Sequence, residues 1–525
     1  MLPYRLWHFM VLVSTRVHYR LQVWQRFQDL LVQCLVYLLT MLRTRISFLN
    51  NANIMREKFI NHIQKYLEGY CLGLLLLVSF LVYAWYTSRN SSIWWDESVY
   101  IDMGKYFISN GKIGMWESLR PPLLPIFYAL AYSLNLPLVF VGQVIVLLAS
   151  VGSIWLTYVI AEQIKKGTGL LAGVFLSITP VFFLFSGIPI TDIISIFFVL
   201  SAVLLHMRKK DYFVGLCIAL AFLLRFPQGL TLVSFGLASL YQTADRNIMQ
   251  WFYVFFRRGL LLCAGFLTLA IPFFIWNYFL YHNIFEPLIL GNAILGVIDA
   301  VYLSRWYYVQ QLWATAPFLF GAILAPIALF FHKKTAQKSS CEVFVTVLII
   351  ALITMAYFFW QPHKELRYSI AFIPFLAVLS SLGVMFLIDL LPHRTVWLVV
   401  VSLGISYFMY LAIPMLTYTD NYPYGSLYGH LEGLQGSYLS TTPVPGALSD
   451  VKLPEIFSTA TNFEDALNRR HDSVDGVIIN SCDIFCGWGN TCSADVSIIQ
   501  TKAQKFFPKK FETKIAQCTY SVFEK

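Results

Sequence analysis

Residues 94–122 read WWDESVYIDMGKYFISNGKIGMWESLRPP, and this stretch lies between two long apolar runs. It places an acidic pair, Asp96 and Glu97, beside hydrocarbon and ends with Arg120 in front of two prolines. Ionisable side chains next to a membrane are costly in free energy, so such a pair indicates a functional site. The structural alternative is that both carboxylates cap the N-terminus of a juxtamembrane helix.

The composition is that of a membrane protein. Of 525 residues, 58% are hydrophobic and 13% are charged, with a mean hydropathy of +0.64. Soluble domains carry roughly 25% charged residues. Apolar runs of about 20 residues, the length that crosses a bilayer core, recur along the chain. The sequence therefore predicts an all-α polytopic membrane protein.

The charge pattern and the missing motifs exclude several classes of function. The net charge of +10 is spread in short basic clusters between apolar runs. This distribution follows the positive-inside rule rather than forming a binding stripe, so nucleic acid is excluded as a partner. The sequence contains no Walker loop, GxGxxG, HExxH or GxSxG motif, which argues against a nucleotide-fuelled pump.

Eleven apolar segments are predicted to cross the membrane. They cover about 70–87, 136–164, 169–187, 193–207, 212–224, 229–241, 259–281, 312–331, 341–360, 368–391 and 396–413. Placing every basic cluster in the cytoplasm puts the N-terminus inside and the C-terminal tail outside. The acidic pair, Asp192, Arg225 and residues 363–367 then share the external face. Residues 121–134 are too short to span and are expected to form an amphipathic helix.

Three domains are predicted. Residues 1–69 form a cytoplasmic basic segment, 70–416 the transmembrane domain with a first external loop at 88–135, and 417–525 a small extracytoplasmic α/β domain. The apolar stretch before Met55 is too short to span. That region is either a basic amphipathic surface helix or an upstream extension.

The tail returns to polar composition and is expected to contain strands at 474–481 and 514–523 and a helix at 463–470. It also holds four of the nine cysteines, which are Cys482, Cys486, Cys492 and Cys518. In an oxidising compartment they predict two disulfides, with three possible pairings. A zinc site is the alternative, but paired CxxC spacing is absent from the sequence.

Several basic residues on the predicted external face suit an anion. Arg120 precedes a proline-started helix, whose N-terminal amides attract negative charge; the alternative is a snorkelling arginine. Arg225 falls between two apolar spans, where an arginine usually faces a phosphate or an intramembrane partner. His363, Lys364, Glu365 and Arg367 form the densest charged cluster between spans, with Lys and Arg suited to phosphate oxygens. An ordinary polar hairpin turn is the alternative.

Asp192 follows Thr191 at the predicted external start of a helix. N-capping of that helix is the plain explanation. A second external acid near Asp96 could instead complete a metal or acceptor site, so a divalent metal remains open.

Residues 96–130 closely resemble the first external loop of the GT-C glycosyltransferase superfamily. The matching pattern is Asp96-Glu97-x-x-Tyr100-x-x-x-Gly104, then Gly111, then Arg120-Pro121-Pro122-Leu123-x-Pro125. It is most similar to the protein O-mannosyltransferases and the lipid A aminoarabinose transferase. Leu224-Arg225-x-Pro227-x-Gly229 is similar to another element of the family. His363-Lys364-Glu365-x-Arg367-Tyr368 resembles a motif of dolichol-dependent and GPI-anchor mannosyltransferases. The resemblance covers about 70–416.

The resemblance implies a GT-C fold and inverting transfer of a sugar, such as mannose, from polyprenyl or dolichyl phosphate. The acceptor would be a protein, glycan or lipid on the extracytoplasmic face of the plasma membrane or endoplasmic reticulum. Asp96 would be the general base, with Glu97 beside it in the catalytic pair. The implied substrate-binding residues are Tyr100, Arg120, Asp192, Arg225, His363, Lys364, Glu365 and Arg367. The tail matches no accessory domain of the family.

Two other classes of function are weighed against this one. A transporter or flippase of a lipid-linked glycan would use external acids to relay protons. Transport would be favoured by an internal repeat and by charges deep within several helices. The charges instead gather on one side, which favours the enzyme. A catalytically silent scaffold with a partner-binding tail is the third possibility.

Overall fold

The computed structural model describes residues 54–89, 93–243, 247–298, 304–332, 338–390, 431, 433–484, 493–515 and 518–525. The N-terminal segment before Ile54, the predicted span at 396–413, Cys486 and Cys492 lie outside the described residues. The predictions made for them stay predictions.

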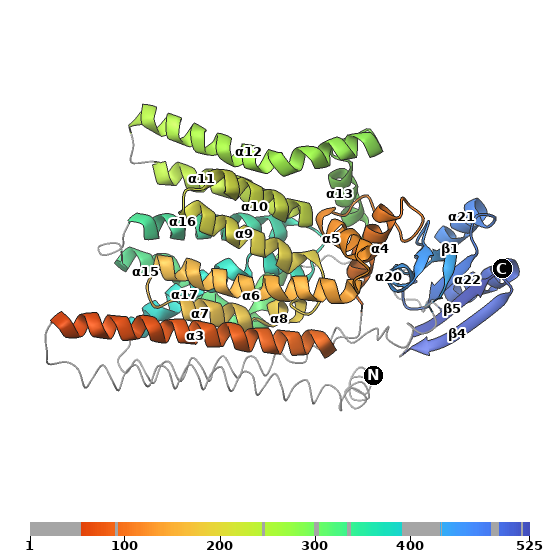
Figure 1. Ribbon diagram of the computed structural model, residues 1–525, viewed down its shortest axis with the longest axis horizontal. Helices are drawn as coiled ribbons and strands as arrows, with labels where there is room; N and C mark the ends of the chain where they lie inside the picture. Colours follow the sequence, from red (N-terminus) through yellow and green to blue (C-terminus); the bar gives the residue numbers. More distant parts are fainter. Residues whose placement is uncertain are drawn as a thin grey trace.

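A bundle of apolar helices forms the larger part of the molecule, and their axes run roughly along one direction (Figure 1). The helices are α3 (Ile54–Arg89), α6 (Leu138–Ile164), α7 (Gly169–Ile178), α8 (Pro180–Phe185), α9 (Thr191–Met207), α10 (Asp211–Leu224), α11 (Thr231–Thr243), α12 (Ile248–Tyr281), α15 (Ala325–His332), α16 (Lys338–Trp360) and α17 (Ile373–Leu390). Many consecutive helices, from α6 to α12, are joined by short connections and run antiparallel, so the chain passes back and forth between the two ends of the bundle.

Five of the described helices are long and apolar enough to cross a membrane. They are α6, α12, α16, α17 and the part of α3 over Glu68–Ser88. A sixth span is obtained if Tyr307–Thr315 and Pro317–Phe331 count as one, although they are bent by 112° at their break. The predicted number of eleven crossings is therefore not established.

Two predicted spans are interrupted in the structure, and proline explains both breaks. The segment 169–187 is divided between α7 and α8, with Thr179 extended just before Pro180. The segment 312–331 is divided between α14 (Tyr307–Thr315) and the 3-10 helix η2 (Pro317–Leu324), which leads into α15. Proline has no N–H to donate and pushes the residue before it out of the helical region.

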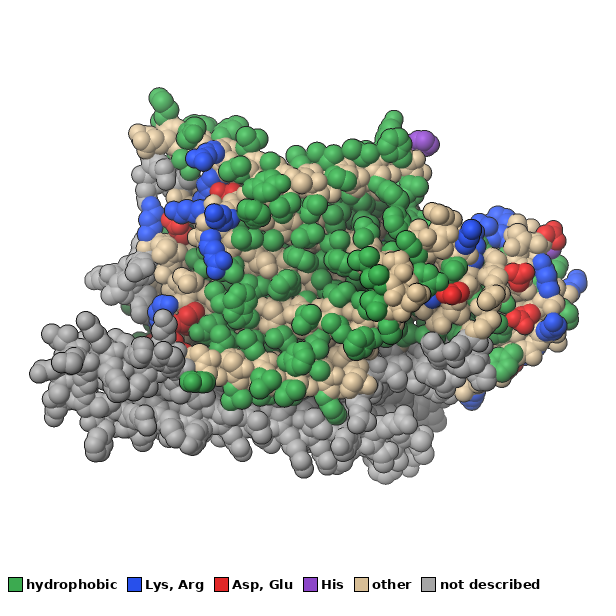
Figure 2. Space-filling model, in the orientation of Figure 1, with side chains coloured by type: hydrophobic (Ala, Val, Ile, Leu, Met, Phe, Trp, Pro, Cys, Tyr) green, Lys and Arg blue, Asp and Glu red, His purple; other side chains and the backbone are tan. Residues whose placement is uncertain are grey.

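The surface of the bundle is divided into zones (Figure 2). Apolar side chains cover its middle, and lysine and arginine side chains gather at the end where α9 leads into α10. The α/β domain, which carries both signs of charge, lies at the opposite end. An apolar belt between two polar ends is the arrangement that suits a bilayer.

The first loop between long helices contains α4 (Trp95–Ile108) and α5 (Leu123–Ser133). α5 is the short helix predicted at 121–134. A Cβ on Gly104 would lie 2.9 Å from both the Ala129 nitrogen and the Pro125 carbonyl oxygen. Glycine therefore allows α5 to cross directly over α4. The segment between the predicted spans at 259–281 and 312–331 contains α13 (Glu286–Ile298).

The C-terminal domain is a five-stranded mixed sheet in the order β2-β1-β3-β5-β4. β1 is parallel to β2 and β3, whereas β5 is antiparallel to β3 and β4. The strands are β1 (Gln435–Ser440), β2 (Asp450–Lys452), β3 (Gly476–Asn480), β4 (Lys509–Ile515) and β5 (Cys518–Glu524). The helices are α20 (Val444–Leu448), α21 (Ala460–Arg470) and α22 (Ser493–Phe506).

Successive side chains of β3 point to opposite faces of the sheet, and both faces are apolar. Val477 and Ile479 pack with α21 and α22, whereas Ile478 packs with Val451, Val522 and, from the first loop, Met115. The predicted strand at 474–481 and helix at 463–470 are present as β3 and α21. The predicted strand at 514–523 is wrong, because the chain reverses between β4 and β5. No glycine or proline marks that turn in the sequence.

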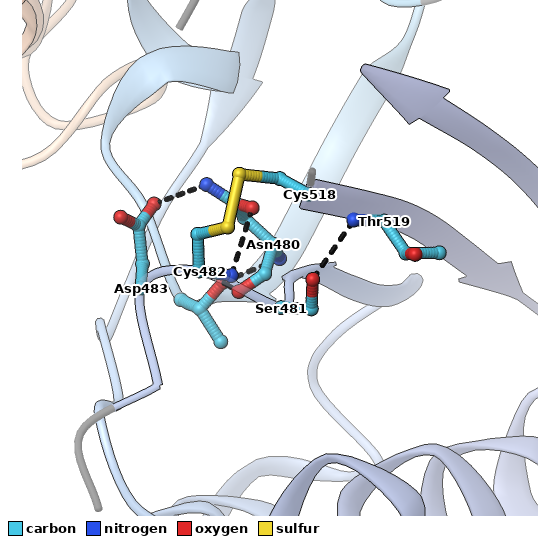
Figure 3. The surroundings of a disulfide bond; sticks show 7 residues. Asn480, Ser481, Cys482, Asp483, Cys518 and Thr519 are labelled. Atoms are coloured by element: carbon cyan, nitrogen blue, oxygen red, sulfur yellow. Dashed lines mark hydrogen bonds between the residues drawn. A yellow bond between two sulfur atoms is a disulfide. The ribbon is translucent and has the colours of Figure 1, made fainter. Parts of the chain in front are cut away.

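A disulfide joins Cys482, just after β3, to Cys518, the first residue of β5 (Figure 3). The surrounding loop is held by hydrogen bonds. The Asn480 side-chain amide donates to Asp483 at 2.6 Å, and the Thr519 N–H donates to the Ser481 hydroxyl at 2.8 Å. The pairing rules out a zinc site built from all four tail cysteines.

Candidate active site

The segments that carry the predicted site residues meet at the end of the bundle beside the α/β domain (Figure 1). α4 and α9 begin there, α10 ends there, and the loop after α16 leads into the 3-10 helix η3 (Leu366–Ala371). Antiparallel packing explains this, since the start of one helix lies next to the end of its neighbour. Residues far apart in the sequence are thereby brought together.

The Asp96 carboxylate, in the first turn of α4, lies between two guanidinium groups. Its Oδ1 is 2.8 Å from Nη2 of Arg120, and its Oδ2 accepts a hydrogen bond from Nη1 of Arg367. Only 13% of the Asp96 side chain is exposed, so water and salt screen these contacts weakly. Each carboxylate oxygen thus has its own arginine, and the two arginines form an anion site that Asp96 fills.

These surroundings set the protonation state of Asp96. Burial alone would raise its pKa, but the charges and hydrogen bonds of Arg120 and Arg367 hold the pKa well below its usual range. The carboxylate is therefore ionised at neutral pH. It is also a weak base for as long as both guanidinium groups remain on it. Transfer of either arginine to another anion would make Asp96 more basic.

Glu97 has different surroundings from its neighbour. Its Oε2 accepts a hydrogen bond from the Trp94 backbone N–H at 3.3 Å, so the capping explanation holds for this member of the pair. The residue is 1% exposed, and its Oε1 has no hydrogen-bond partner within the described part of the chain. Burial raises the pKa of Glu97 to about 8, against the opposing effect of the Trp94 bond. Glu97 is therefore mainly protonated at neutral pH.

Asp192 pairs with Arg225 rather than capping its helix. The N-cap of α9 is Ile190, without a side-chain capping bond, and Nη1 of Arg225 contacts Oδ1 of Asp192. The guanidinium carbon of Arg225 also lies 4.7 Å from the ring centroid of Tyr368 and 5.5 Å from that of Phe358. These contacts stabilise the buried Arg225 guanidinium, because the carboxylate and the aromatic faces offset the free-energy cost of removing it from water.

Glu365 organises the cluster after α16. Its Oε2 lies 2.6 Å from Nε of Arg367, and its Oε1 lies 2.9 Å from Nε2 of His363 and accepts a hydrogen bond from the Tyr368 hydroxyl. Burial would raise the pKa of Glu365, but Arg367 and His363 hold it at about 2. Lys364 is buried and donates to the Gln361 carbonyl oxygen. The segment is therefore a fixed charged network rather than a solvated turn.

Tyr100 lies one helical turn after Asp96 and supports Arg120. The guanidinium carbon of Arg120 is 5.6 Å from the Tyr100 ring centroid, and the Tyr100 hydroxyl is 3.5 Å from Oγ1 of Thr191. Nε of Arg120 is also 2.7 Å from Oε2 of Glu117. The snorkelling explanation for Arg120 therefore does not hold, because its head group is directed at protein carboxylates.

Two residues of this network had no role assigned from the sequence. Glu117 lies three positions before Arg120, which is a spacing that allows pairing but is common in any loop. Tyr368 follows Arg367 directly and lies against the guanidinium groups of both Arg225 and Arg367. Its place at the end of the His363-Lys364-Glu365-x-Arg367-Tyr368 motif is the signal in the sequence that points to it.

The acidic residues that the structure describes at the site are not arranged as metal ligands. Within the described ranges, no group of three or more His, Cys, Asp or Glu side chains is placed to hold a metal ion. Asp96 and Asp192 each contact an arginine instead. The described residues of the site therefore do not fit a divalent metal.

Comparison with known proteins gives matches in structure only. No protein-family model and no curated protein sequence matches this chain. Among solved structures, ArnT from Cupriavidus metallidurans bound to undecaprenyl phosphate superposes with a TM-score of 0.56 and 13% identity, covering 86% of this chain and 97% of ArnT. The Archaeoglobus fulgidus oligosaccharyltransferase tethered to an acceptor peptide superposes with a TM-score of 0.53 and 12% identity, covering 88% of this chain and 75% of that protein.

Both similarities extend over the helix bundle and beyond it, since they cover more than four-fifths of this chain. The predicted fold class is confirmed by these matches and by the mostly helical structure with its small C-terminal sheet. The chain is a polytopic membrane protein with the GT-C fold.

Proposed function

We propose that the protein is an integral-membrane glycosyltransferase that moves a sugar from polyprenyl or dolichyl phosphate to an acceptor hydroxyl, with inversion at the sugar carbon. The observation that carries the proposal is the Asp96 carboxylate held between Arg120 and Arg367. Asp96 and Arg120 lie in the loop whose sequence resembles the GT-C first external loop. The shared fold with ArnT, solved with undecaprenyl phosphate, supports a lipid-linked donor.

The arginines provide the site for the donor phosphate. Arg120 and Arg367 already bind one anion, the Asp96 carboxylate, and Arg225 lies against the same Tyr368 ring as Arg367. Guanidinium groups bind phosphate oxygens in pairs, and burial strengthens that attraction. A donor phosphate would therefore compete with Asp96 for the guanidinium groups.

This competition supplies the base. When phosphate takes the arginines, the pKa of Asp96 is no longer held low, and the carboxylate can accept a proton from the acceptor hydroxyl. The acceptor oxygen then forms a bond to the anomeric carbon as the bond from that carbon to the phosphate oxygen breaks. The leaving phosphate keeps the electron pair, and its added negative charge is stabilised by the arginines.

The sequence resemblance also suggests the sugar, the acceptor and the side of the membrane, which belong to the same proposal. The donor sugar is a hexose such as mannose, and the acceptor is a protein, glycan or lipid. The reaction takes place on the extracytoplasmic face, with the N-terminus in the cytoplasm. Support for this side comes from the basic clusters, which lie at the end of the bundle away from Asp96 (Figure 2).

Sugar transfer by purified protein tests the proposal. The protein in lipid nanodiscs is given radiolabelled hexosyl-phosphopolyprenols, with Ser/Thr peptides, lipid-linked glycans or membrane lipids as acceptors. We expect label to move to one acceptor class and free polyprenyl phosphate to appear in equal amount. Absence of transfer from every donor, together with movement of intact labelled donor across sealed proteoliposomes, would instead establish a transporter.

A further inference from the structure

The helix that carries Asp96 is also bound to the α/β domain. Lys105, in the last turn of α4, is 5% exposed. Its ammonium group donates to main-chain carbonyl oxygens at and just beyond the end of α20, and it also contacts Asp450. The distances from Nζ are 3.0 Å to Gly446, 3.3 Å to Ala447, 2.9 Å to Ser449 and 3.4 Å to the Asp450 carboxylate.

Two glycines allow the close packing that surrounds this contact. A Cβ on Gly446 of α20 would lie 2.4 Å and 2.6 Å from the carboxylate oxygens of Asp102, which is fully buried. A Cβ on Gly114, where φ is +72°, would lie 2.3 Å from the Asp102 backbone oxygen. A larger residue at Gly114 would force the loop off the α4 backbone, and one at Gly446 would displace the buried Asp102 carboxylate beside Lys105.

The loop after α4 is joined to the edge of the sheet as well. The Gly114 N–H donates to the Val451 carbonyl at 2.8 Å, and the Leu453 N–H donates to the Gly114 carbonyl at 3.0 Å. Next to this bridge, Met115 packs on the apolar face formed by Ile478 and its neighbours. The domain therefore holds the first loop by a buried ammonium, a strand-like bridge and an apolar contact.

The contact between α4 and the domain affects Asp96, because Asp96 and Lys105 belong to the same helix. Asp96 and Lys105 lie about 14 Å apart along one continuous helix. A tilt of α4 at its Lys105 end would therefore displace Asp96. Displacements of about 1 Å at a catalytic group can reduce a rate by about 100-fold.

We propose that the α/β domain positions Asp96 through α4, with Lys105 as the positioning residue that joins them. The inference rests on the proposed function only for the role of Asp96 as the general base. Lys105 touches no reacting atom; it acts through the helix. A residue with a purely structural role would alter the amount of folded protein, whereas a positioning residue alters turnover in folded protein.

The test compares three variants. Lys105→Met removes the ammonium and keeps a chain of similar length, and Gly446→Ala disturbs the same contact from the domain side. Lys112→Met, an exposed lysine of the same loop, is the matched control. For each, hydrogen exchange is measured at the Gly114 and Leu453 amides, with kcat at saturating donor and the Kd of the donor lipid.

We expect Lys105→Met and Gly446→Ala to raise exchange at both amides at least tenfold and to lower kcat at least tenfold. Donor Kd should stay within twofold, because Arg225 and Arg367 are held by the bundle rather than by the domain. Exchange in α6 should not change. Lys112→Met should behave like the wild type. A kcat within twofold of wild type in Lys105→Met, or unchanged exchange at Gly114, would overturn the inference.

A readout independent of turnover separates this inference from the proposed function. In an Asp96→Cys background, maleimide labelling of the peptide containing residue 96 is followed by mass spectrometry, with and without Lys105→Met. Faster labelling with Lys105→Met supports the positioning role even if no donor gives transfer. Equal labelling rates would reject it, whatever the activity of the wild type.

Discussion

Arg367 and Asp96 are 271 positions apart in the sequence, and the Arg367 guanidinium contacts the Asp96 carboxylate. Arg120 occupies the other oxygen of the same carboxylate. The site is thus assembled from the first loop and the loop after α16, and the Asp96 carboxylate occupies the place proposed for a donor phosphate.

The first prediction concerns donor binding by Arg367. Because Arg367 is proposed to exchange Asp96 for phosphate, Arg367→Met should weaken binding of polyprenyl phosphate by about 10- to 100-fold, the range for one charge-assisted hydrogen bond. Arg367→Lys should recover part of this affinity, since it keeps the charge without the fork. Equilibrium binding of labelled lipid measures the effect, with the exposed Arg469→Met as control. Equal affinity in Arg367→Met and wild type would contradict the phosphate role.

The second prediction concerns the buried pair of Asp192 and Arg225. Either Asp192→Ala or Arg225→Met leaves one charge without its partner, which costs about 3–5 kcal/mol of unfolding free energy for a buried pair. The loss of unfolding free energy in the double variant should be clearly smaller than the sum of the losses in the two single variants. Unfolding in mixed micelles gives the three values. Strict additivity would show that the two side chains do not depend on each other.

The third prediction is a pH dependence from Glu97, whose pKa burial raises to about 8 from an ordinary value of 4.5. The folded state then binds more protons than the unfolded state between these values, so this contribution to stability is lost as pH rises toward 8. Glu97→Gln should flatten the decline of the melting temperature between pH 6 and 8.5. Asp102, whose pKa burial also raises, stays in both proteins and cancels in the difference.

The control for this measurement is Asp472→Asn, because the Asp472 side chain is 95% exposed and lies in the tail. Its pH profile should match the wild type. A Glu97→Gln profile parallel to that of the wild type would mean that Glu97 does not titrate in this window.

The fourth prediction concerns the disulfide between Cys482 and Cys518, which closes a chain segment with a sequence separation of 36. Replacing both cysteines by alanine should destabilise the α/β domain by about 2–4 kcal/mol, because the cross-link restricts the unfolded chain. Hydrogen exchange in β3 and β5 reports the loss. Cys263→Ala, an exposed free cysteine, should leave exchange unchanged. Unaltered protection in the double variant would exclude a stabilising role.

Much of the membrane domain could be predicted because it depends on local signals. The lengths of the apolar runs located the helices, and the basic clusters indicated which helix ends share a side. Residues such as Asp192 and Arg367 could therefore be assigned to the same side. The breaks at Pro180 and Pro317 were missed because apolar composition continues across them. The hairpin between β4 and β5 was missed because alternation also continues and the turn lacks glycine.

The contacts between distant segments could not be derived from the pattern. Nothing local distinguishes an Asp192 that caps a helix from one that pairs with Arg225, since the choice depends on helix packing. The sequence gives no sign of the role of Lys105 either, because its partners include main-chain carbonyls in and just after α20. The close approach of Gly114 to the Asp102 backbone, and of Gly446 to the Asp102 carboxylate, became visible only in the structure.

The most direct test of the central claim measures sugar transfer and donor binding together in wild type and Asp96→Asn. Asparagine keeps the shape but cannot take a proton, so kcat should fall by about 10²–10⁴-fold, the range for a general base. Donor binding should be equal or tighter, because the amide no longer competes with phosphate for Arg120 and Arg367. Asp472→Asn should retain full activity. Transfer by Asp96→Asn at the wild-type rate would contradict the assignment of Asp96 as the base.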